Sequence, residues 1–387
     1  MPLDRDTLGD LIFTIRRYVQ ERLLPNEARL DEEDSIPPEI LEEMRRLGFF
    51  GLTIPEEYGG LGLTSEEEAL VNFELGRSSP AFRSAFGTNN GIGSQAIVMA
   101  GTEEQKQRYL PDLAAGELIG SFALTEPEAG SDAGGLATRA VRDGDSYVLD
   151  GTKRYITNAP VAGLFTVMAR TDPAAKRAAG VSAFVVEADT PGLSVGPKER
   201  KMGQHGAPVA DVVFTDCRVP AAALLGGVEG EGFRVAMKVL DRGRLGISAS
   251  FTGFAERILD EMVAYALQRQ QFGRPIADFQ LIQAMIADSK ADLVAARAMV
   301  LESSRAHDRG DDISLLAACC KLFTSEALGR VADRNVQVHG GAGYVGDYPA
   351  ERHYRDARLA RIYEGTSQIQ QLIIARNVTR TAKAAMG

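Results

Sequence analysis

A glutamate near the end of the sequence has the surroundings of a catalytic base. Glu364 lies between the apolar pair at 362–363 and a Gly-Thr-Ser turn at 365–367, and an amphipathic helix is expected to follow. Apolar neighbours disfavour the charged form of a carboxylate, so its pKa rises toward the pH at which it removes a proton from a carbon acid. On these residues alone, a surface glutamate near a helix start is favoured, with Ser367 and Gln370 as a capping box.

A second segment, distant in sequence, combines small residues with a tight turn. It reads Leu124-Thr125-Glu126-Pro127-Glu128-Ala129-Gly130-Ser131-Asp132 and follows Phe122-Ala123. Small residues in a tight turn let backbone N–H groups approach a flat ligand. The alternative is an ordinary connection between a helix and a strand.

Together, the two segments resemble the acyl-CoA dehydrogenase family of flavoenzymes, and the resemblance extends over nearly the whole chain. It implies that Glu364 removes the α-proton of an acyl-CoA thioester while the β-carbon gives a hydride to N5 of FAD, yielding a trans-2-enoyl-CoA. It also implies that the Glu364 N–H and a ribityl hydroxyl polarise the thioester oxygen. Some members carry the base at the position of Gly243, where this chain has glycine and therefore no carboxyl group. Nitroalkane oxidases have aspartate at the position of Glu364.

The resemblance assigns two groups of residues to FAD, one along the flavin ring and one that reaches the FAD of a neighbouring subunit. Tyr155 stands where the family usually has tryptophan, which this chain lacks. The guanidinium of Arg269 suits a pyrophosphate. The shared site implies a homo-oligomer, at least a dimer and usually a tetramer. The full set is Phe122, Leu124, Thr125, Gly130, Ser131, Tyr155, Thr157, Arg269, Phe272, Gln280, Gln337, Gly340, Gly341, Thr366 and Gln368.

The glycines that follow His339 lack the strand–turn–helix context of a dinucleotide-binding fingerprint, which argues against a nicotinamide cofactor. We expect His339 itself to be a structural histidine rather than a ligand or a catalyst.

Substrate contacts are assigned by the same resemblance to Arg83, Ser131, Asp241, Arg244 and Gly365. The run Phe82-Arg83-Ser84-Ala85 resembles the segment with which glutaryl-CoA dehydrogenases hold a distal carboxylate. An arginine at the blind end of an acyl cavity would favour a dicarboxyl-CoA, because an unpaired buried cation is costly. The alternative is a helix arginine that faces solvent or an internal acid.

The C-terminal half most resembles short- and branched-chain members, so we expect a short to medium or branched acyl chain and electrons passing to an electron-transfer flavoprotein. Three alternatives remain open. They are a dicarboxyl-CoA dehydrogenase that uses Arg83, an acyl-CoA oxidase that uses oxygen, and a non-catalytic CoA-thioester-binding relative.

Composition excludes several other classes of protein. The formal net charge of -10 argues against nucleic acid as a partner, whereas a local basic patch can still bind coenzyme A. The three cysteines show no metal-ligand spacing, and we expect no metal site. No apolar run is long enough for membrane insertion, and no targeting pattern is evident at the start, so we expect a cytoplasmic bacterial enzyme.

The patterning predicts a multi-domain α+β protein: an N-terminal helical domain at 1–120, a β-barrel-like middle domain at 121–225 and a C-terminal four-helix bundle domain at 226–387. Thr102 and Gln105 form a capping box that opens a helix. Asp150-Gly151 is typical of a hairpin turn between two strands. Long apolar helices are expected over 281–304 and 313–338, with a dense run of charges at 348–358 that we expect to form structural ion pairs.

Overall fold

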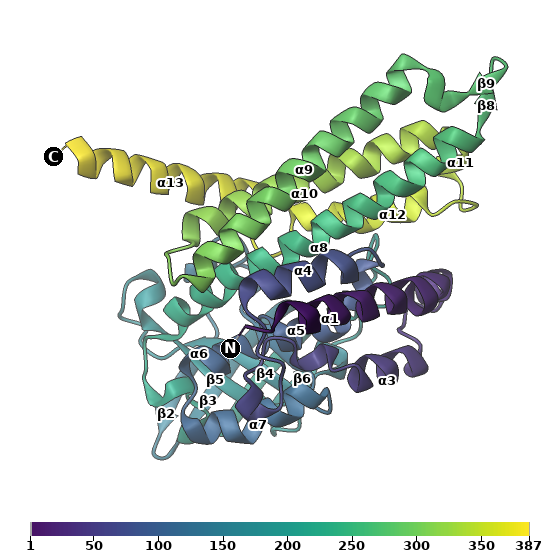
Figure 1. The fold of residues 1–387 in the computed structure, drawn as a ribbon. Helices are drawn as coiled ribbons and strands as arrows, with labels where there is room; N and C mark the ends of the chain where they lie inside the picture. The colour runs from purple at the N-terminus through teal and green to yellow at the C-terminus, as the bar shows by residue number, and fades with distance from the viewer. Residues whose placement is uncertain (1, 387) are drawn as a thin grey trace.

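The computed structural model describes residues 2–386 and shows two helical parts joined through a β-sheet (Figure 1). This order of helical, β and helical parts is the one predicted from the sequence. The N-terminal helices are α1 (Arg5–Tyr18), α2 (Glu27–Glu33), α3 (Pro38–Arg46), α4 (Ser65–Leu75), α5 (Pro80–Asn90), α6 (Gln95–Ala100) and α7 (Glu103–Ala115). The main strands are β1 (Gly120–Ala123), β2 (Arg139–Asp143), β3 (Ser146–Thr157), β4 (Leu164–Arg170), β5 (Val181–Glu187), β6 (Leu193–Val195) and β7 (Val209–Pro220). The C-terminal part contains α8 (Gly232–Gln268), β8 (Gln270–Gln271), β9 (Arg274–Pro275), α9 (Gln280–Asp308), α10 (Ser314–His339), α11 (Gly341–Tyr344), α12 (Ala350–Arg358) and α13 (Ser367–Met386).

The predicted capping box at the start of α7 is confirmed. The Thr102 hydroxyl accepts a hydrogen bond from the Gln105 N–H at 3.3 Å, and the Gln105 amide oxygen accepts one from the Thr102 N–H at 3.0 Å. These contacts satisfy two backbone donors that the first turn leaves without partners. Gly116 ends the helix with a left-handed φ of 75°.

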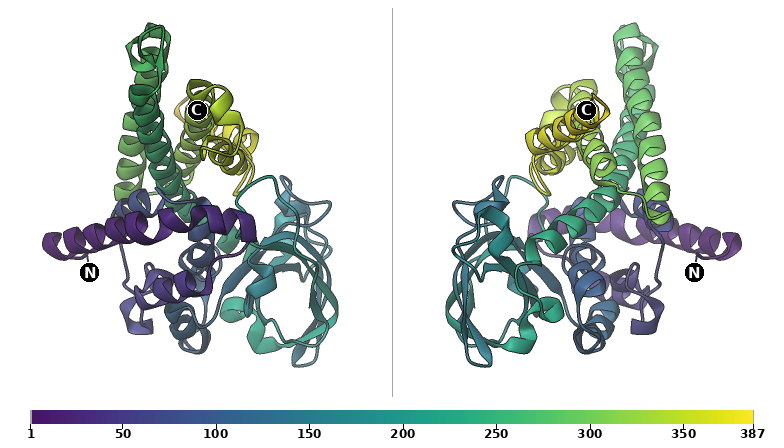
Figure 2. Two further views of the ribbon diagram at one scale, coloured as in Figure 1. Left: turned by 90° about the vertical axis from the view of Figure 1, so that its right-hand side faces the viewer. Right: turned by 90° about the vertical axis from the view of Figure 1, so that its left-hand side faces the viewer.

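The middle part is a curled sheet of seven strands in the order β1-β4-β2-β3-β7-β6, with β5 paired to β4. The sheet stands to one side of the helices in both views of Figure 2. Its inward face packs around large buried side chains such as Phe165, Phe184 and Tyr147. The strands therefore form a core of their own, against which the helices pack.

The prediction of a hairpin turn at Asp150-Gly151 is wrong. Strand β3 continues through both residues, and the turn that joins β2 to β3 lies earlier, where Asp143 pairs with Ser146. The register between β3 and β7 shifts between Leu149 and Gly151, so the glycine belongs to a β-bulge. A Cβ on Gly151 would lie 2.5 Å from the Thr138 hydroxyl, which shows that the glycine permits a close approach of two strands.

The C-terminal part is built around α10, which packs against α8, α9, α12 and α13. Figure 1 shows α8, α9 and α10 running alongside one another toward the small β8–β9 hairpin, while α13 leads away in another direction. Small residues such as Ala317, Ala318 and Ala332 are fully buried on α10 and let its neighbours pack closely. The helix that follows the catalytic-base candidate, α13, therefore begins at the centre of this helical assembly.

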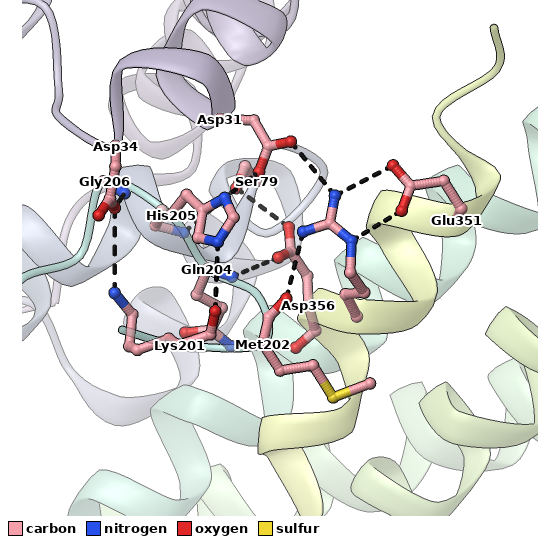
Figure 3. A network of polar contacts seen from close by, with 12 residues as sticks. Asp31, Asp34, Ser79, Lys201, Met202, Gln204, His205, Gly206, Glu351 and Asp356 are labelled. Carbon is pink, nitrogen blue, oxygen red and sulfur yellow. Dashed lines mark hydrogen bonds and ion pairs between the residues drawn. The ribbon is translucent and has the colours of Figure 1, made fainter. Parts of the chain in front are cut away.

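A polar network joins all three parts of the chain just before that point (Figure 3). Asp356 on α12 accepts hydrogen bonds from the Gln204 N–H, in the loop after β6, and at 3.5 Å from the Ser79 hydroxyl, next to α5. Arg355 pairs with Glu351 at 2.7 Å and with Asp31 of α2 at 3.2 Å. The prediction that the charges at 348–358 form structural ion pairs is confirmed.

Burial raises the pKa of Asp356 to about 6, although the hydrogen bond from Gln204 works in the opposite direction. The carboxyl is therefore stabilised in its place by its donors rather than by a direct ion pair. The β-sheet loop and the N-terminal helices thus hold α12 at a fixed position.

A second buried cluster is centred on Glu27, of which only 2% is exposed. Its carboxylate pairs with Arg257 of α8 and, at 3.1 Å, with Arg352 of α12, and it accepts the Ser79 N–H at 2.7 Å. One acid thus compensates two arginines that come from distant parts of the chain. Removal of one partner from such a buried set leaves an uncompensated charge.

We predict that Glu27→Gln lowers the free energy of unfolding by about 3–5 kcal/mol, because Arg257 and Arg352 lose the anion that compensates them. Glu33→Gln is the matched control, since Glu33 lies on the same helix but is exposed and pairs only with the exposed Arg29. Urea unfolding followed by circular dichroism should show a lower midpoint for Glu27→Gln alone. Equal midpoints for the two variants would contradict a stabilising role for the cluster.

Candidate active site

Glu364 occupies a strained turn between α12 and α13. Its φ is 54° and that of Gly365 is 92°, both in the left-handed region that side chains other than glycine rarely adopt. The positive φ of Gly365 favours glycine, and a Cβ there would lie 2.6 Å from Gln370 Nε2 and displace that amide. Such a conformation persists only when its surroundings hold it in place.

Three side chains from three helices hold the turn by its carbonyl groups. Arg244 of α8 donates from Nε to the Glu364 carbonyl at 3.2 Å. Lys321 of α10 donates to the Gly365 carbonyl at 2.8 Å. Gln370 of α13 donates to both carbonyls at 3.1 Å. The backbone of the base is thus fixed while its carboxylate is left free.

The predicted Ser367–Gln370 capping box is wrong. The Ser367 hydroxyl donates instead to Glu326 at 2.6 Å, and the Gln370 amide serves the turn. Thr366 takes the capping role, because its hydroxyl accepts the Ile369 N–H at 3.3 Å. The side chains at the start of α13 are therefore used to hold the turn in place.

Glu364 is half-buried, and the Oε2 atom of its carboxylate is enclosed by the protein. Its Oε2 atom has no hydrogen-bond partner among residues 2–386. Burial raises the pKa of Glu364, and the positive charges of Arg83, Arg244 and Lys321 act against that rise. A raised pKa makes a carboxylate a stronger acceptor of a proton, as a general base requires.

Gly243 faces this carboxylate from α8. A Cβ on Gly243 would lie 3.3 Å from Glu364 Oε2 and 3.7 Å from Ile92 Cγ2. Positions 243 and 364, the two at which members of the resembling family carry the base, therefore lie next to each other. Because position 243 is glycine, Glu364 is the residue of the two that has a carboxyl group.

Arg83 is a partly buried arginine of α5 that has no acidic partner among residues 2–386. Its Nε is buried without a hydrogen-bond partner, and its charge reaches Glu364. It lines a small cavity together with Ser84, Ser250, Phe251 and Tyr363. Arg83 is thus half-buried, and Glu364 is the acid on which its charge acts, although no direct ion pair joins the two side chains among the described residues.

Arg244 and its neighbours on α8 are mainly turned toward the protein interior. Arg244 pairs with Asp241 at 2.6 Å, and Arg242 pairs with Glu68 of α4 at 3.1 Å. Burial raises the pKa of Asp241 and the charge of Arg244 opposes the rise. The structure thus brings Arg244 to the backbone of Glu364, in addition to any contact with substrate.

The predicted flavin segment rests on a buried lysine of β3. Lys153 is fully buried and donates to Glu126 at 2.7 Å and to the Leu124 carbonyl at 3.2 Å. The N–H of Arg154 donates to the Thr125 carbonyl at 2.8 Å. Burial lowers the pKa of Lys153 to about 8, against the influence of Glu126. The segment is therefore held to the sheet by its backbone, as the turn of Glu364 is held to the helices.

Comparison with known proteins decides the family. Family models described as acyl-CoA dehydrogenase N-terminal, middle and C-terminal domains match residues 8–117, 121–217 and 230–379. The chain belongs to the acyl-CoA dehydrogenase family. The predicted three-part fold, enzyme class and dependence on FAD are thereby confirmed.

Relatives of this acyl-CoA dehydrogenase cover almost the whole chain. It is 44% identical to an acryloyl-CoA reductase (NADH) from Anaerotignum propionicum, over 94% of this chain and 92% of the relative. It is 41% identical to the mitochondrial short-chain specific acyl-CoA dehydrogenase of Homo sapiens, over 97% and 90% respectively. The solved structure of butyryl-CoA dehydrogenase from Megasphaera elsdenii matches with a TM-score of 0.93 and 36% identity, over 98% of this chain and 100% of that one.

The residues predicted to contact the flavin ring lie around β1 and β3. Phe122 and Leu124 are buried, whereas Tyr155 is 59% exposed and adopts a positive φ of 58° in a second bulge of β3. Thr157 is half-buried at the end of the same strand. The hydroxyl groups, open aromatic ring and fixed backbone of this surface suit a flat flavin ring.

The residues assigned to a neighbouring subunit's FAD lie elsewhere, at the far end of the long helices. The members, all exposed, are Arg269, Phe272, Gln280, Gln337, Gly340 and Gly341. Figure 1 shows this end, marked by β8, β9 and α11, well away from the β-sheet. Within residues 2–386 Arg269 has no acidic partner, so its guanidinium is free for an anion. One chain therefore does not bring the two predicted FAD groups together.

The remaining assigned residues are near the base or at the surface. Gly130 and Ser131 are exposed in the loop after β1, and Gln368 is exposed on α13. His339 donates from Nδ1 to the Asn335 carbonyl at 2.8 Å and stacks on Tyr265, as expected for a structural histidine. Their contacts with FAD or substrate stay predictions.

Three buried residues were missed by the sequence analysis: Lys153, Lys321 and Gln370. The sequence could have indicated the two lysines, because each occupies a position at which the hydrophobic pattern of its strand or helix predicts a buried side chain. Gln370 gave no such signal, since its amide matches an ordinary helix start.

The described residues hold no group of acidic, histidine and cysteine side chains able to bind a metal ion. Across residues 2–386, no helix combines the length and the apolar character needed to cross a bilayer.

We predict that Lys153→Met lowers both stability and FAD retention, because Glu126 loses its cation and the Leu124 carbonyl loses its donor. Breaking a buried pair costs about 3–5 kcal/mol. The double variant Glu126→Gln/Lys153→Met removes both charges and should recover much of the stability. Thermal melting and the flavin-to-protein ratio measure the two effects. A single variant as stable and as yellow as the parent would refute this role of the pair.

Proposed function

We propose that the enzyme dehydrogenates a short to medium or branched acyl-CoA to the trans-2-enoyl-CoA, with Glu364 as the base. The observation that carries this proposal is the Glu364 carboxylate: its Oε2 atom is enclosed without a partner among residues 2–386, its pKa is raised, and its backbone is fixed. No structural need accounts for an acid in this state, because an unsatisfied buried carboxyl destabilises a fold.

In the proposed reaction the Glu364 carboxylate takes the α-proton of the thioester. Arg244, Lys321 and Gln370 keep its backbone in place during the transfer. The N–H of Glu364 donates to the thioester oxygen and stabilises the negative charge that develops there. Bound FAD supplies the acceptor for the hydride from the β-carbon.

We further propose a homo-oligomer, at least a dimer, that passes electrons to an electron-transfer flavoprotein. Support comes from the separation of the two groups of FAD residues in one chain and from the exposed Phe272, of which 93% is accessible. A second copy would complete the site and cover this ring. The boundaries near 120 and 225 are kept as the proposed division into domains.

A second candidate substrate is a dicarboxyl-CoA. The observation that favours it is Arg83, whose charge lies in the cavity beside Tyr363 without an acid to pair with. A substrate carboxylate at the end of a short acyl chain would supply the missing partner. The same arginine would penalise a long apolar chain.

The function is tested by the absorption spectrum of the anaerobic, FAD-loaded protein, recorded before and after addition of butyryl-, isobutyryl-, octanoyl- and glutaryl-CoA. Bleaching of the flavin by one thioester, with a new long-wavelength band, would support the proposal and indicate the substrate class. Addition of enoyl-CoA to the reduced protein tests the reverse direction, since one relative is a reductase. A flavin that no acyl-CoA reduces would contradict the proposal.

We predict that Glu364→Gln lowers kcat by at least about 100-fold while FAD stays bound, because the amide keeps the shape of the side chain and loses the base. Glu302→Gln on α9 is the control, since Glu302 is exposed and contacts only Arg309. Stopped-flow bleaching measures the chemical step directly. Normal bleaching in Glu364→Gln would show that this protein uses another base or only binds CoA thioesters.

We predict that Arg83→Met changes the preference between substrates and does not abolish turnover. If a carboxylate pairs with Arg83, kcat/KM for glutaryl-CoA falls at least about tenfold more than that for butyryl-CoA, a difference of about 1.4 kcal/mol. Arg83→Lys keeps the charge and should retain part of the preference. Equal changes for both thioesters would end the dicarboxyl-CoA candidate and leave the main proposal intact.

A further inference from the structure

Lys321 is a fully buried lysine without a direct acidic partner. It lies on α10, and none of its surface is exposed. Its only hydrogen bond among the described residues runs from Nζ to the Gly365 carbonyl, at 2.8 Å. Burying an ammonium group without an anion lowers the stability of the fold. A lysine buried in this way therefore indicates a role other than stabilisation.

The acids near Lys321 are already occupied or belong to the site. Glu326, on the next turn of α10, pairs with Arg361 and accepts the Ser367 hydroxyl. Asp241 of α8 pairs with Arg244 at 2.6 Å. This leaves Glu364 as the acid that faces Lys321 without a direct ion pair of its own.

Neighbouring charges both raise and lower the pKa of Lys321. Burial lowers its pKa to about 8, with the positive charge of Arg244 adding to the effect. Glu364 and Glu326 act in the opposite sense. At neutral pH the lysine is therefore mainly charged, and its field favours the ionised form of Glu364.

We propose that Lys321 is the positioning residue of the base: it anchors the Gly365 carbonyl, which keeps the Glu364 carboxylate beside Gly243, and its charge favours the ionised carboxylate. This inference rests on the proposed function and adds a residue to it that does not touch the substrate. Its two parts, the anchor and the charge, have separate consequences.

Loss of the charge changes the pH dependence. The base works only when ionised, so activity falls as the pH drops through the pKa of Glu364. Lys321 lowers that pKa, and Lys321→Met should therefore move the low-pH limb of the kcat profile to higher pH. The remaining cations facing the carboxylate, Arg83 of α5 and Arg244 of α8, still act in the variant, so the limb moves without disappearing.

Loss of the anchor affects the geometry of the chemical step. A displaced base is poorly aligned for proton transfer, and small displacements cost one to two orders of magnitude in rate. We expect kcat at the plateau of the profile to fall about 10- to 100-fold, with KM changed much less. Lys321→Arg keeps the charge on a larger side chain, so the low-pH limb should stay near its original position even where kcat drops.

The test compares Lys321→Met, Lys321→Arg and one control, all saturated with FAD. Ser325→Ala removes another buried polar group of α10, and the hydroxyl of Ser325 bonds, among the described residues, to the Leu322 carbonyl alone. Steady-state rates from pH 5.5 to 9 give the profiles, and melting temperatures report general damage to the fold.

A second measurement does not depend on turnover. Isotope-edited infrared spectra, with glutamate labelled at its carboxyl carbon, follow the conversion of the protonated to the ionised form of Glu364. Glu364→Gln identifies the band by its loss. The midpoint of this conversion should lie at higher pH in Lys321→Met than in the parent, and should be unchanged in Ser325→Ala.

A raised midpoint together with a lowered kcat in Lys321→Met, partly restored in Lys321→Arg, would support the proposal. A variant that loses only thermal stability, with kcat and the infrared midpoint unchanged, would overturn it. If Glu364→Gln itself turns over substrate normally, the proposed function fails first. If Glu364→Gln is inactive while Lys321→Met is normal, the Lys321 inference alone fails.

Discussion

The rest of the proposed site depends on one constraint: the Oε2 atom of Glu364 is enclosed without a hydrogen-bond partner among residues 2–386. A base whose carboxylate is held by direct bonds loses reactivity, and Glu364, the proposed base, is held through its backbone instead. The donors Arg244, Lys321 and Gln370 come from α8, α10 and α13 and converge on two adjacent carbonyls. The strained turn persists because its surroundings over-determine it.

Glu126, a buried glutamate, shows the opposite solution. It is paired directly with Lys153 and accepts the Ala137 N–H; burial acts to raise its pKa, but these partners outweigh burial and the pKa is lowered. For Glu364, burial outweighs the more distant cations and the pKa is raised. Both acids lie near a buried lysine. The two glutamates differ in what their lysine binds. Lys153 bonds to the carboxylate of Glu126, whereas Lys321 bonds to the Gly365 carbonyl and leaves the Glu364 carboxylate without a direct ion pair.

Sequence reasoning was most successful where a pattern is local and has one physical meaning. The capping box at Thr102 is such a case, and the order of the three parts followed from the change in hydrophobic period. It failed at Asp150-Gly151, where the same pair of residues suits a hairpin turn or a bulge and only the pairing with β7 decides between them. It also missed Lys153 and Lys321, because the value of a buried lysine depends on a carbonyl brought close by tertiary folding. The contacts of the assigned residues with FAD and acyl-CoA stay predictions, as does the division into domains.

The position of the base depends on contacts well beyond its turn. Helix α12 leads directly into that turn, and Asp356 on α12 is held by Gln204 of the sheet loop, while Glu27 of α2 holds Arg352. The Glu364 carbonyl is fixed by Arg244 of α8, and the Gly365 carbonyl by Lys321 of α10. The β-sheet that carries the predicted flavin segment is thus connected through α12 to the base. A change in how the sheet packs against the helices would move the proposed base relative to the predicted flavin surface. The polar network of Figure 3 therefore connects the proposed site of proton removal to the predicted site of hydride transfer.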